Sequence, residues 1–368
     1  MKRTILTVAA LTLLLVLSVP PATATTTTAA EFVAQDPTSE EAAAYKAWYE
    51  ANAAKDYPKA MELAKAYLQK FPNGNAKNLE YLKKTWIPQV RGMQYKEAAD
   101  KKNIAEVIRI GKEVLAEDPD NLDYIWAVHL QIRTNELSAS PGNFAHASDA
   151  SDLAQRAIRL FEGGKNLTGV DPKTFKLNVT LAYLHQTLAL ISDNNKDTDK
   201  ALAEYTKAAE LDPTNVTYFF HCGRIYNDRY NAAAQKYDTA QKKADALPEA
   251  ERNAAEPKPE VKAVLEEAKA ALAEVKSRAE PVINCWARYL GLTADKPSDA
   301  RTTVLGVVTG LYKFLNNQSE DGLQKLIEDN KTSPTPVKMS PPPAHAAAPP
   351  KAAAEPTTPL KQNGKKPR

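Results

Sequence analysis

The chain has 368 residues, of which 43% are hydrophobic, and its 48 Lys and Arg residues nearly balance 45 Asp and Glu residues, for a formal net charge of +3. So small an excess of positive charge does not favour a nucleic-acid-binding protein. Only 13 glycines and few alternating runs of Val, Ile and Thr argue against a fold built mainly of strands.

The N-terminal segment has the pattern of an exported protein. Lys2 and Arg3 precede an apolar stretch from Ile5 to Val19, and the triplet Ala22-Thr23-Ala24 follows two prolines. This is the order of charged region, short apolar region and small-residue cleavage site in a secretory signal peptide. We therefore expect a cleaved signal peptide over residues 1–24 and a soluble protein in the periplasm or outside the cell. An uncleaved N-terminal anchor is the alternative.

A long helical region is expected after a Thr-rich linker over residues 25–39. Between residues 40 and 330, Ala, Leu, Lys, Glu and Gln recur at the three- and four-residue spacing of amphipathic helices. Prolines, glycines and turn-forming polar residues divide the first part of this region into pairs of helices. The predicted pairs span 40–54 with 57–71, 75–100 with 103–117, 121–136 with 149–161, and 172–192 with 198–211.

The helices expected after these pairs are less regular. One opens at Thr214 and continues past Ala240 through a stretch rich in Ala, Lys and Gln, and another spans 261–279. Proline lacks an amide proton and clashes with the preceding turn, so we expect Pro281 to end or kink that helix. A last pair is expected at 301–315 and 320–329.

The C-terminal segment, residues 331–368, differs in composition from everything before it. Between Pro334 and Arg368 lie ten of the 25 prolines and six basic residues, against one acidic residue. Too little apolar surface is present to offset the entropy of ordering, so we expect a disordered, partly polyproline-II tail. This tail suggests one function, that of an envelope adaptor whose tail contacts anionic polymers or a membrane surface.

Two consecutive stretches, residues 182–215 and 216–249, share a spacing of small and aromatic residues. The residues that carry it are Ala182, Leu188, Ala189, Ala201, Tyr205, Ala208 and Pro213, followed by Val216, Phe219, Cys222, Gly223 and Tyr226. In this spacing the chain resembles the tetratricopeptide repeat family, whose helix-turn-helix units have about 34 residues. The resemblance implies an all-α fold in which the hairpins stack as a right-handed solenoid. An irregular helical bundle is the alternative.

The resemblance also implies a binding site. In tetratricopeptide repeats the first helix of each pair lines a concave groove that accepts an extended peptide or a partner helix. The corresponding positions here are Tyr183, Gln186, Leu190, Thr217, Phe220, Arg224 and Asn227. Packing between helices is the alternative role for Leu190 and Phe220. The Lys/Asn set with which some members bind a C-terminal carboxylate is not reproduced.

Catalysis and a bound cofactor have little support in the sequence. The five histidines are dispersed, and none belongs to a His-Glu-x-x-His or Cys-x-x-Cys arrangement, so we expect no metal site. No Gly-x-Ser-x-Gly elbow, Walker-type loop or dinucleotide fingerprint is present. His221 and Cys222 are adjacent, but neighbours on a helix point in different directions. An enzyme with a helical site of a new kind is the remaining alternative.

Cys222 and Cys285 are the only two cysteines. Export makes a disulfide between them chemically feasible. Because Cys222 occupies a core position of its repeat-like stretch, a buried free thiol fits equally well. The sequence leaves both states open.

Together these patterns predict a non-catalytic scaffold of the cell envelope or the secreted space. It would bind a protein or peptide partner in the groove, with no cofactor, no metal and no nucleic acid. The patterns do not identify the partner or the oligomeric state.

Overall fold

The computed structural model describes residues 39–336 and residue 338, and the regular elements in this part of the chain are all helices. The predicted all-α fold is therefore confirmed for the described residues. The predicted signal peptide, nearly all of the predicted linker and most of the predicted tail lie outside them. Over the described ranges, no helix combines the length and apolar character needed to cross a membrane. The chain divides into two compact units, unit 1 (Met1–Leu211) and unit 2 (Asp212–Arg368).

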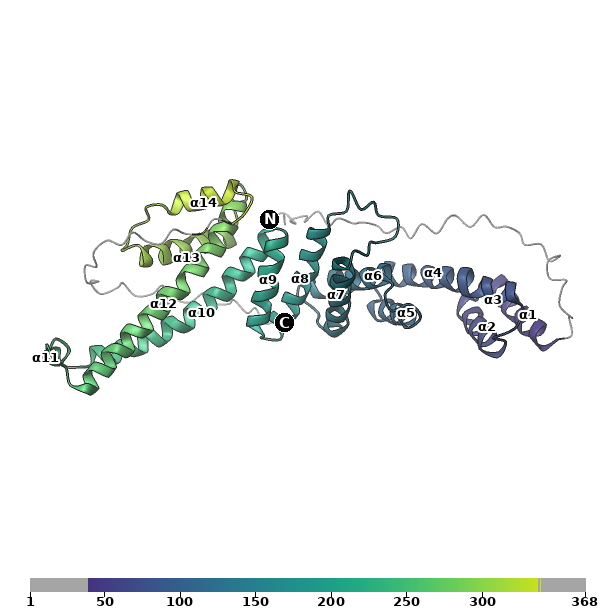
Figure 1. Cartoon of the computed structure of the whole chain (residues 1–368), viewed down its shortest axis with the longest axis horizontal. Helices are drawn as coiled ribbons and strands as arrows, with labels where there is room; N and C mark the ends of the chain where they lie inside the picture. The colour runs from purple at the N-terminus through teal and green to yellow at the C-terminus, as the bar shows by residue number, and fades with distance from the viewer. Residues whose placement is uncertain (1–38, 337, 339–368) are drawn as a thin grey trace, which may run out of the picture. The chain divides into compact units, whose positions relative to one another are not determined.

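The helices of unit 1 follow one another in four pairs (Figure 1). They are α1 (Glu40–Ala53) with α2 (Tyr57–Lys70); α3 (Ala76–Tyr81), η2 (Leu82–Trp86) and α4 (Ile87–Asp100) with α5 (Ile104–Glu117); α6 (Leu122–Ile132) and η3 (Arg133–Leu137) with α7 (Ala147–Glu162); and α8 (Leu177–Asn194) with α9 (Thr198–Leu211). The two η segments are π-helical turns that continue neighbouring α-helices. We call the first member of each pair, including its η segment, the first helix.

Consecutive pairs pack on one another. Contacts join α2 to α4, α5 to α6 and α7 to α8, in addition to the contacts within each pair. Each pair thus covers the apolar face of its neighbour in the chain, which is how stacked helical repeats bury a continuous core.

Three of the four pairs share one turn. In each, a lysine at positive φ (59°, 54° and 64°) is followed by an Asp or Asn whose amide donates a hydrogen bond to the carbonyl five residues earlier. The Asp or Asn side chain then accepts from an amide in the first turn of the second helix, at 3.2 or 3.3 Å. This is a Schellman ending joined directly to a helix N-cap. The turns are Lys55-Asp56, Lys102-Asn103 and Lys196-Asp197.

Two of the cores in the described part of unit 1 are built from large apolar side chains. The first surrounds Trp48, Tyr67 and Trp86, and the second extends from Tyr95 to Ile191. The small and aromatic positions on which the family resemblance rests are fully buried in α8 and α9. They are Ala182, Ala189, Ala201, Tyr205 and Ala208, each 0% exposed.

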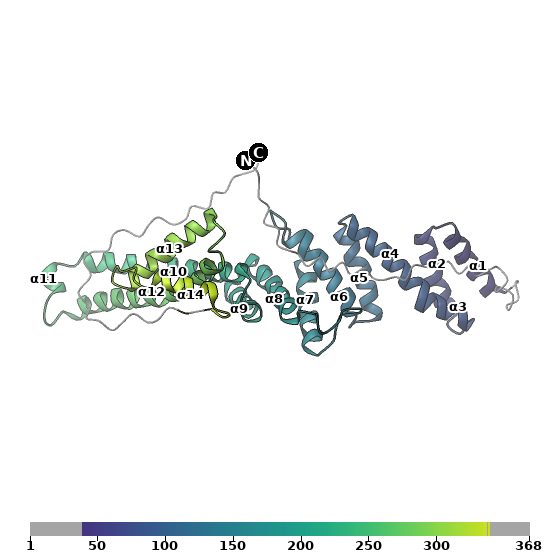
Figure 2. The same ribbon diagram turned by 90° about the horizontal axis from the view of Figure 1, so that it is seen from above.

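Unit 2 is built on two long antiparallel helices. They are α10 (Val216–Asp245) and α12 (Pro259–Leu292), which Figures 1 and 2 show side by side with the short α11 (Glu249–Arg252) in their connection. The remaining helices, α13 (Asp299–Leu315) and α14 (Leu323–Thr332), pack on α12. Toward α11, the two long helices meet through the small side chains of Ala240, Ala244 and Ala268.

A buried arginine and a close helix contact join the helices of unit 2. Arg288 is 1% exposed, and its guanidinium donates to the carbonyl oxygens of Pro213 (2.7 Å), Asn330 (2.7 Å) and Ser333 (2.8 Å). Gly291, one turn further along α12, packs so closely on α14 that a Cβ there would lie 2.6 Å from the carbonyl carbon of Asn330.

Unit 2 departs from the sequence prediction in two places. Residues 216–249, the second repeat-like stretch, form one continuous helix as far as Asp245 and no helix-turn-helix, because Pro248 is the first strong helix breaker they contain. Pro281 was expected to end or kink its helix, and the first of these outcomes is not found, since α12 continues through the proline to Leu292. The residues after the proline, among them Ile283 and Trp286, are buried, and this burial outweighs a cost of about 3 kcal/mol.

Unit 1 departs from the prediction at one helix start. The fourth pair was expected to begin at Pro172, whereas α8 begins at Leu177. The preceding residues form a turn in which the amides of Thr174 and Phe175 donate to the carbonyl of Asp171.

Candidate interaction surface

Among the described residues of unit 1, the large apolar side chains that are more than about a third exposed all lie on first helices. Their relative exposures are between 37% and 45%, and they lie on α1, α3, α4 and α8. No second helix in this part of the chain presents one. Single exposed apolar residues are common, but their confinement to one member of each pair marks a surface. The residues are Tyr49, Tyr81, Met93, Leu177 and Val179.

The densest part of this surface is an aromatic group on α1, α3 and η2, which we call the Trp48 cluster. The indole of Trp48 is 2% exposed, and its centroid lies 4.8 Å from the ring of Tyr45, 6.4 Å from Tyr49, 6.1 Å from Tyr81 and 5.3 Å from Trp86. These distances are those of favourable aromatic pairs. The buried indole thus supports two tyrosines that face solvent, at 43% and 42% exposure.

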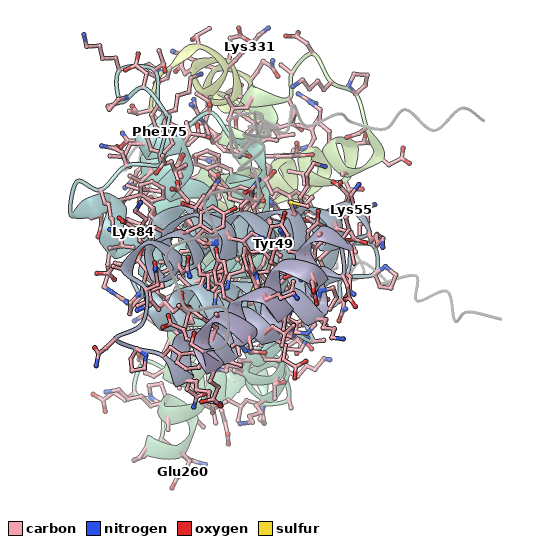
Figure 3. All side chains as sticks on the ribbon, turned by 90° about the vertical axis from the view of Figure 1, so that its right-hand side faces the viewer. Tyr49, Lys55, Lys84, Phe175, Glu260 and Lys331 are labelled. Atoms are coloured by element: carbon pink, nitrogen blue, oxygen red, sulfur yellow. The ribbon has the colours of Figure 1, made fainter. Side chains whose placement is uncertain are left out.

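The Trp48 cluster forms because α1 carries aromatic residues on adjoining faces. Tyr45 and Trp48 are three positions apart and turn inward, whereas Tyr49, one position further, turns outward. In Figure 3, which looks onto the α1 end of unit 1, Tyr49 lies between Lys84 and Lys55. Trp86 is fixed from the side by a 2.8 Å hydrogen bond from its Nε1 to Asn52 Oδ1.

The phenols of Tyr45 and Tyr81 are neutral at physiological pH. Burial, and to a lesser extent Tyr81, raises the pKa of Tyr45 to about 12. Burial also raises the pKa of Tyr81. Uncharged tyrosines combine a flat apolar face with a hydroxyl that donates or accepts a hydrogen bond. The cluster can therefore contact proline rings, aliphatic side chains and peptide groups.

The predicted groove residues of α8 are packed within unit 1. Tyr183 is half-buried, with its ring 6.1 Å from Trp126, and the guanidinium of Arg133 lies 5.4 Å above it. Gln186 is only 8% exposed, and Leu190 is half-buried. All three lie on a first helix, as predicted, but the most exposed apolar residues of α8 are at its N-terminus.

The predicted groove residues of α10 are all half-buried. They are Thr217, Phe220, Arg224 and Asn227. Phe220 packs within unit 2, with its ring 5.4 Å from that of Tyr289, and Arg224 forms an ion pair with Asp228 at 3.3 Å. Because the α8 and α10 residues belong to different units, the groove that would combine them stays a prediction.

Unit 1 also contains a buried polar group beside η3. His129 is fully buried, and its Nε2 lies 3.1 Å from the hydroxyl of Thr187, which itself donates to the carbonyl of Tyr183. A hydroxyl has one proton to donate, so Nε2 of His129 carries the ring proton. Burial, reinforced by Arg133, lowers the pKa of His129 to about 3. The neutral ring is therefore too weak a base to serve as a proton acceptor at neutral pH.

Two other histidines form contacts with glutamates. Nδ1 of His146 lies 3.0 Å from the carboxylate of Glu136, and Nδ1 of His185 lies 2.7 Å from that of Glu204. The first contact joins η3 to the start of α7, and the second joins the two helices of the fourth pair. Both therefore fasten neighbouring helices together.

Two hollows lie between second helices and their neighbours in unit 1. One of about 240 Å³ is mainly apolar, and one of about 470 Å³ is rich in hydroxyl, amide and carboxylate groups. The larger is lined by Ala147, Ser148, Ser151, Asp152, Gln155, Leu188, Ile191, Ser192, Asn195, Asp197 and Lys200. None of the groove residues predicted from the sequence lines the larger hollow.

The described residues contain no group of three or more His, Cys, Asp or Glu side chains that could share a metal ion. No protein-family model and no curated protein sequence matches the chain. The structure of each unit is therefore the basis for any functional assignment.

Sequence reasoning missed the exposed tyrosines of the Trp48 cluster. Periodicity alone assigns Tyr45, Trp48 and Tyr49 to an apolar face without saying which ring turns outward. The spacing of the three residues gives no such signal, because positions i, i+3 and i+4 share one face of a helix.

Proposed function

We propose that the protein is a non-catalytic scaffold that binds an extended peptide segment of a partner protein along the first helices of unit 1. One observation carries the proposal: among the residues of unit 1 that the structure describes, the large apolar side chains more than about a third exposed all belong to first helices. Side chains of this kind form the energetic centre of protein interfaces, where tyrosine is enriched.

The resemblance to tetratricopeptide repeats supports the same assignment. Packing of consecutive pairs and the shared lysine turn fit a repeat architecture, and in that family the first helices carry the ligand. A right-handed solenoid of such repeats is part of this proposal. So is action outside the cytoplasm, which follows from the signal-peptide pattern in residues 1–24.

The proposal assigns the leading role to the Trp48 cluster. Substitutions at Phe220 and Arg224, two of the groove positions predicted from the sequence, would disturb the packing of α10 on α12 and a local ion pair. Tyr49 and Tyr81 are more exposed, at 43% and 42%, and their rings pack against the neighbouring Trp48 from its solvent side. Substitutions at these two tyrosines therefore separate binding from folding more cleanly.

The test selects ligands from a phage-displayed library of random 12-residue peptides on the immobilised full chain. We expect the double variant Tyr49→Ser/Tyr81→Ser to weaken binding of the selected peptides at least about tenfold, with unchanged helicity by circular dichroism. Gln69→Ser, at an exposed position of the second helix α2, is the matched control and should bind like the unaltered chain. Selected peptides that bind the double variant and the unaltered chain equally well would show that the surface is misassigned.

A further inference from the structure

The register of the α10–α12 hairpin is fixed by several contacts. Phe220 packs on Tyr289, and further along the hairpin Lys243 forms a 2.9 Å ion pair with Glu267. The indole Nε1 of Trp286 donates to the carbonyl of Phe220 at 3.2 Å. As residue numbers rise along α10 they fall along α12, so each residue of one helix has a defined opposite residue on the other.

This register brings the two cysteines together. Cys222 follows Phe220 on α10, and Cys285 precedes Trp286 on α12. Gly223 allows the close approach at this point, because a Cβ there would overlap the indole of Trp286. The side chains of Cys222 and Cys285 are hydrogen-bonded to each other, and both are free thiols.

We propose that Cys222 and Cys285 form an intramolecular disulfide that fastens α10 to α12. The inference rests on the opposing positions of the two thiols and is independent of the ligand-binding surface of unit 1. The cysteines are distant in sequence, so the bond would close a loop that contains most of both long helices and α11.

Oxidation joins the two Sγ atoms and removes one proton and one electron from each thiol. The oxidant is a molecule with a disulfide of its own, such as a thiol–disulfide oxidoreductase or oxidised glutathione. A thiolate of the hairpin attacks that disulfide, and the second thiol then displaces the mixed partner. The oxidant's bond is broken, and its two sulfurs leave as thiols.

The environment of the pair indicates a structural bond and not a catalytic one. Cys222 is 3% exposed, so reductants have little access to it in the folded protein. A hydrogen bond with Cys222 and burial both raise the pKa of Cys285, which suppresses the reactive thiolate. The bond should therefore form while the helices are still closing, and it should persist once they have packed.

The experiment refolds the full chain from denaturant in a mixture of reduced and oxidised glutathione, then alkylates any free thiols under denaturing conditions. Trypsin cleaves after Lys207, Arg224, Arg278 and Arg288. We expect mass spectrometry without reductant to find peptides 208–224 and 279–288 joined. Two alkylated cysteines in protein with native helicity would overturn the proposal, and so would glutathione attached in place of the joined peptides.

Thermal unfolding supplies a second readout with matched variants. Reduction should lower the Tm of the transition that includes unit 2 by about 5–10 °C. The variants Cys222→Ser and Cys285→Ser cannot form the bond, so each should unfold at the same temperature with and without reductant. If the unaltered refolded chain has the same Tm with and without reductant, that result would also contradict the disulfide.

Discussion

Apart from the short α3, the α-helices of unit 1 have 11 to 18 residues. In three of its four pairs, the two helices are connected by the same kind of turn. Unit 2 rests instead on helices of 30 and 34 residues. In unit 1, large aromatic and branched side chains bury each pair against the next. In unit 2, the long helices meet partly through alanines, and a glycine and a buried arginine join α12 to the rest.

The difference lies in how stability is distributed. In unit 1 each helix pair packs mainly on the pairs next to it in sequence. A destabilising substitution in one pair should therefore lower the stability of that pair and its neighbours only. Unit 2 concentrates its connections around the C-terminal part of α12. A few substitutions there should therefore affect the whole unit. Hydrogen exchange read by mass spectrometry separates the two cases, because it reports protection for each segment.

The largest expected effect is that of Arg288→Ala. Carbonyl oxygens of Pro213, Asn330 and Ser333 would lose their donor inside the unit, and a cavity would remain. We expect unit 2 to lose about 4 kcal/mol of unfolding free energy, measured as faster exchange of α12 and α14. Arg278→Ala removes a more exposed α12 side chain that is paired with Glu274. It should change the unfolding free energy of unit 2, derived from exchange protection, by less than about 0.5 kcal/mol. If Arg288→Ala lowered hydrogen-exchange protection in unit 1 as much as in unit 2, the proposed difference between the two units would be wrong.

A somewhat smaller effect is expected for Gly291→Ala. The new methyl group meets the backbone of α14, which cannot move aside cheaply, so we expect a loss of about 2–3 kcal/mol. Gly306→Ala in α13 is the matched control, because a Cβ there meets nothing within 4 Å. It should raise stability by up to about 1 kcal/mol through helix propensity. Urea denaturation followed by circular dichroism compares the two.

Mild acid should act mainly on unit 1. The pKa of His129 is lowered from 6.5 to about 3 in the folded protein. The unfolded chain therefore binds a proton near pH 6.5 that the folded one does not bind, and stability falls as the pH drops below that value. From pH 6.5 to pH 5 we expect a loss of about 2 kcal/mol, visible as faster exchange of α6.

The variant His129→Asn isolates this effect because its side chain does not titrate. It should be less stable than the unaltered chain at pH 7 and less sensitive to acid between pH 6.5 and pH 5. If both proteins lose α6 protection in parallel over that range, another group is responsible.

The smallest effect is expected for Tyr49→Ala. Its ring is 43% exposed, whereas the adjacent Trp48 is 2% exposed. We expect the tyrosine substitution to cost less than about 1 kcal/mol, whereas Trp48→Ala should cost about 3–5 kcal/mol. Exchange rates of α1 and α2 measure both. A large loss for Tyr49→Ala would mean that the ring serves packing and not a partner.

Most helices of unit 1 could be predicted because their ends are encoded locally. Asp56, Asn103 and Asn121 each begin a helix by accepting a hydrogen bond from a nearby backbone amide. The same reasoning failed at Pro281, where the local penalty is outweighed by burial of residues that follow it. Long-range contacts of this kind leave no periodic signal in the sequence.

The candidate surface was predictable only to the level of the helices that carry it. Family resemblance pointed to first helices, and the most exposed large apolar residues in the described part of unit 1 lie there. It selected Gln186, however, which is 8% exposed, and Phe220, which is half-buried against Tyr289. Whether a side chain faces a neighbour or solvent depends on where the next helix lies, and α1 presents Tyr49 outward for that reason.

The Arg288 contacts have a consequence for synthesis. Each hairpin of unit 1 joins residues close in sequence and can close soon after it emerges from the ribosome. Arg288 bonds Pro213, 75 residues before it, and Ser333, 45 residues after it. Until Ser333 has been made, this guanidinium lacks one of its acceptors, so unit 2 should reach its native packing only after residue 333 has emerged from the ribosome.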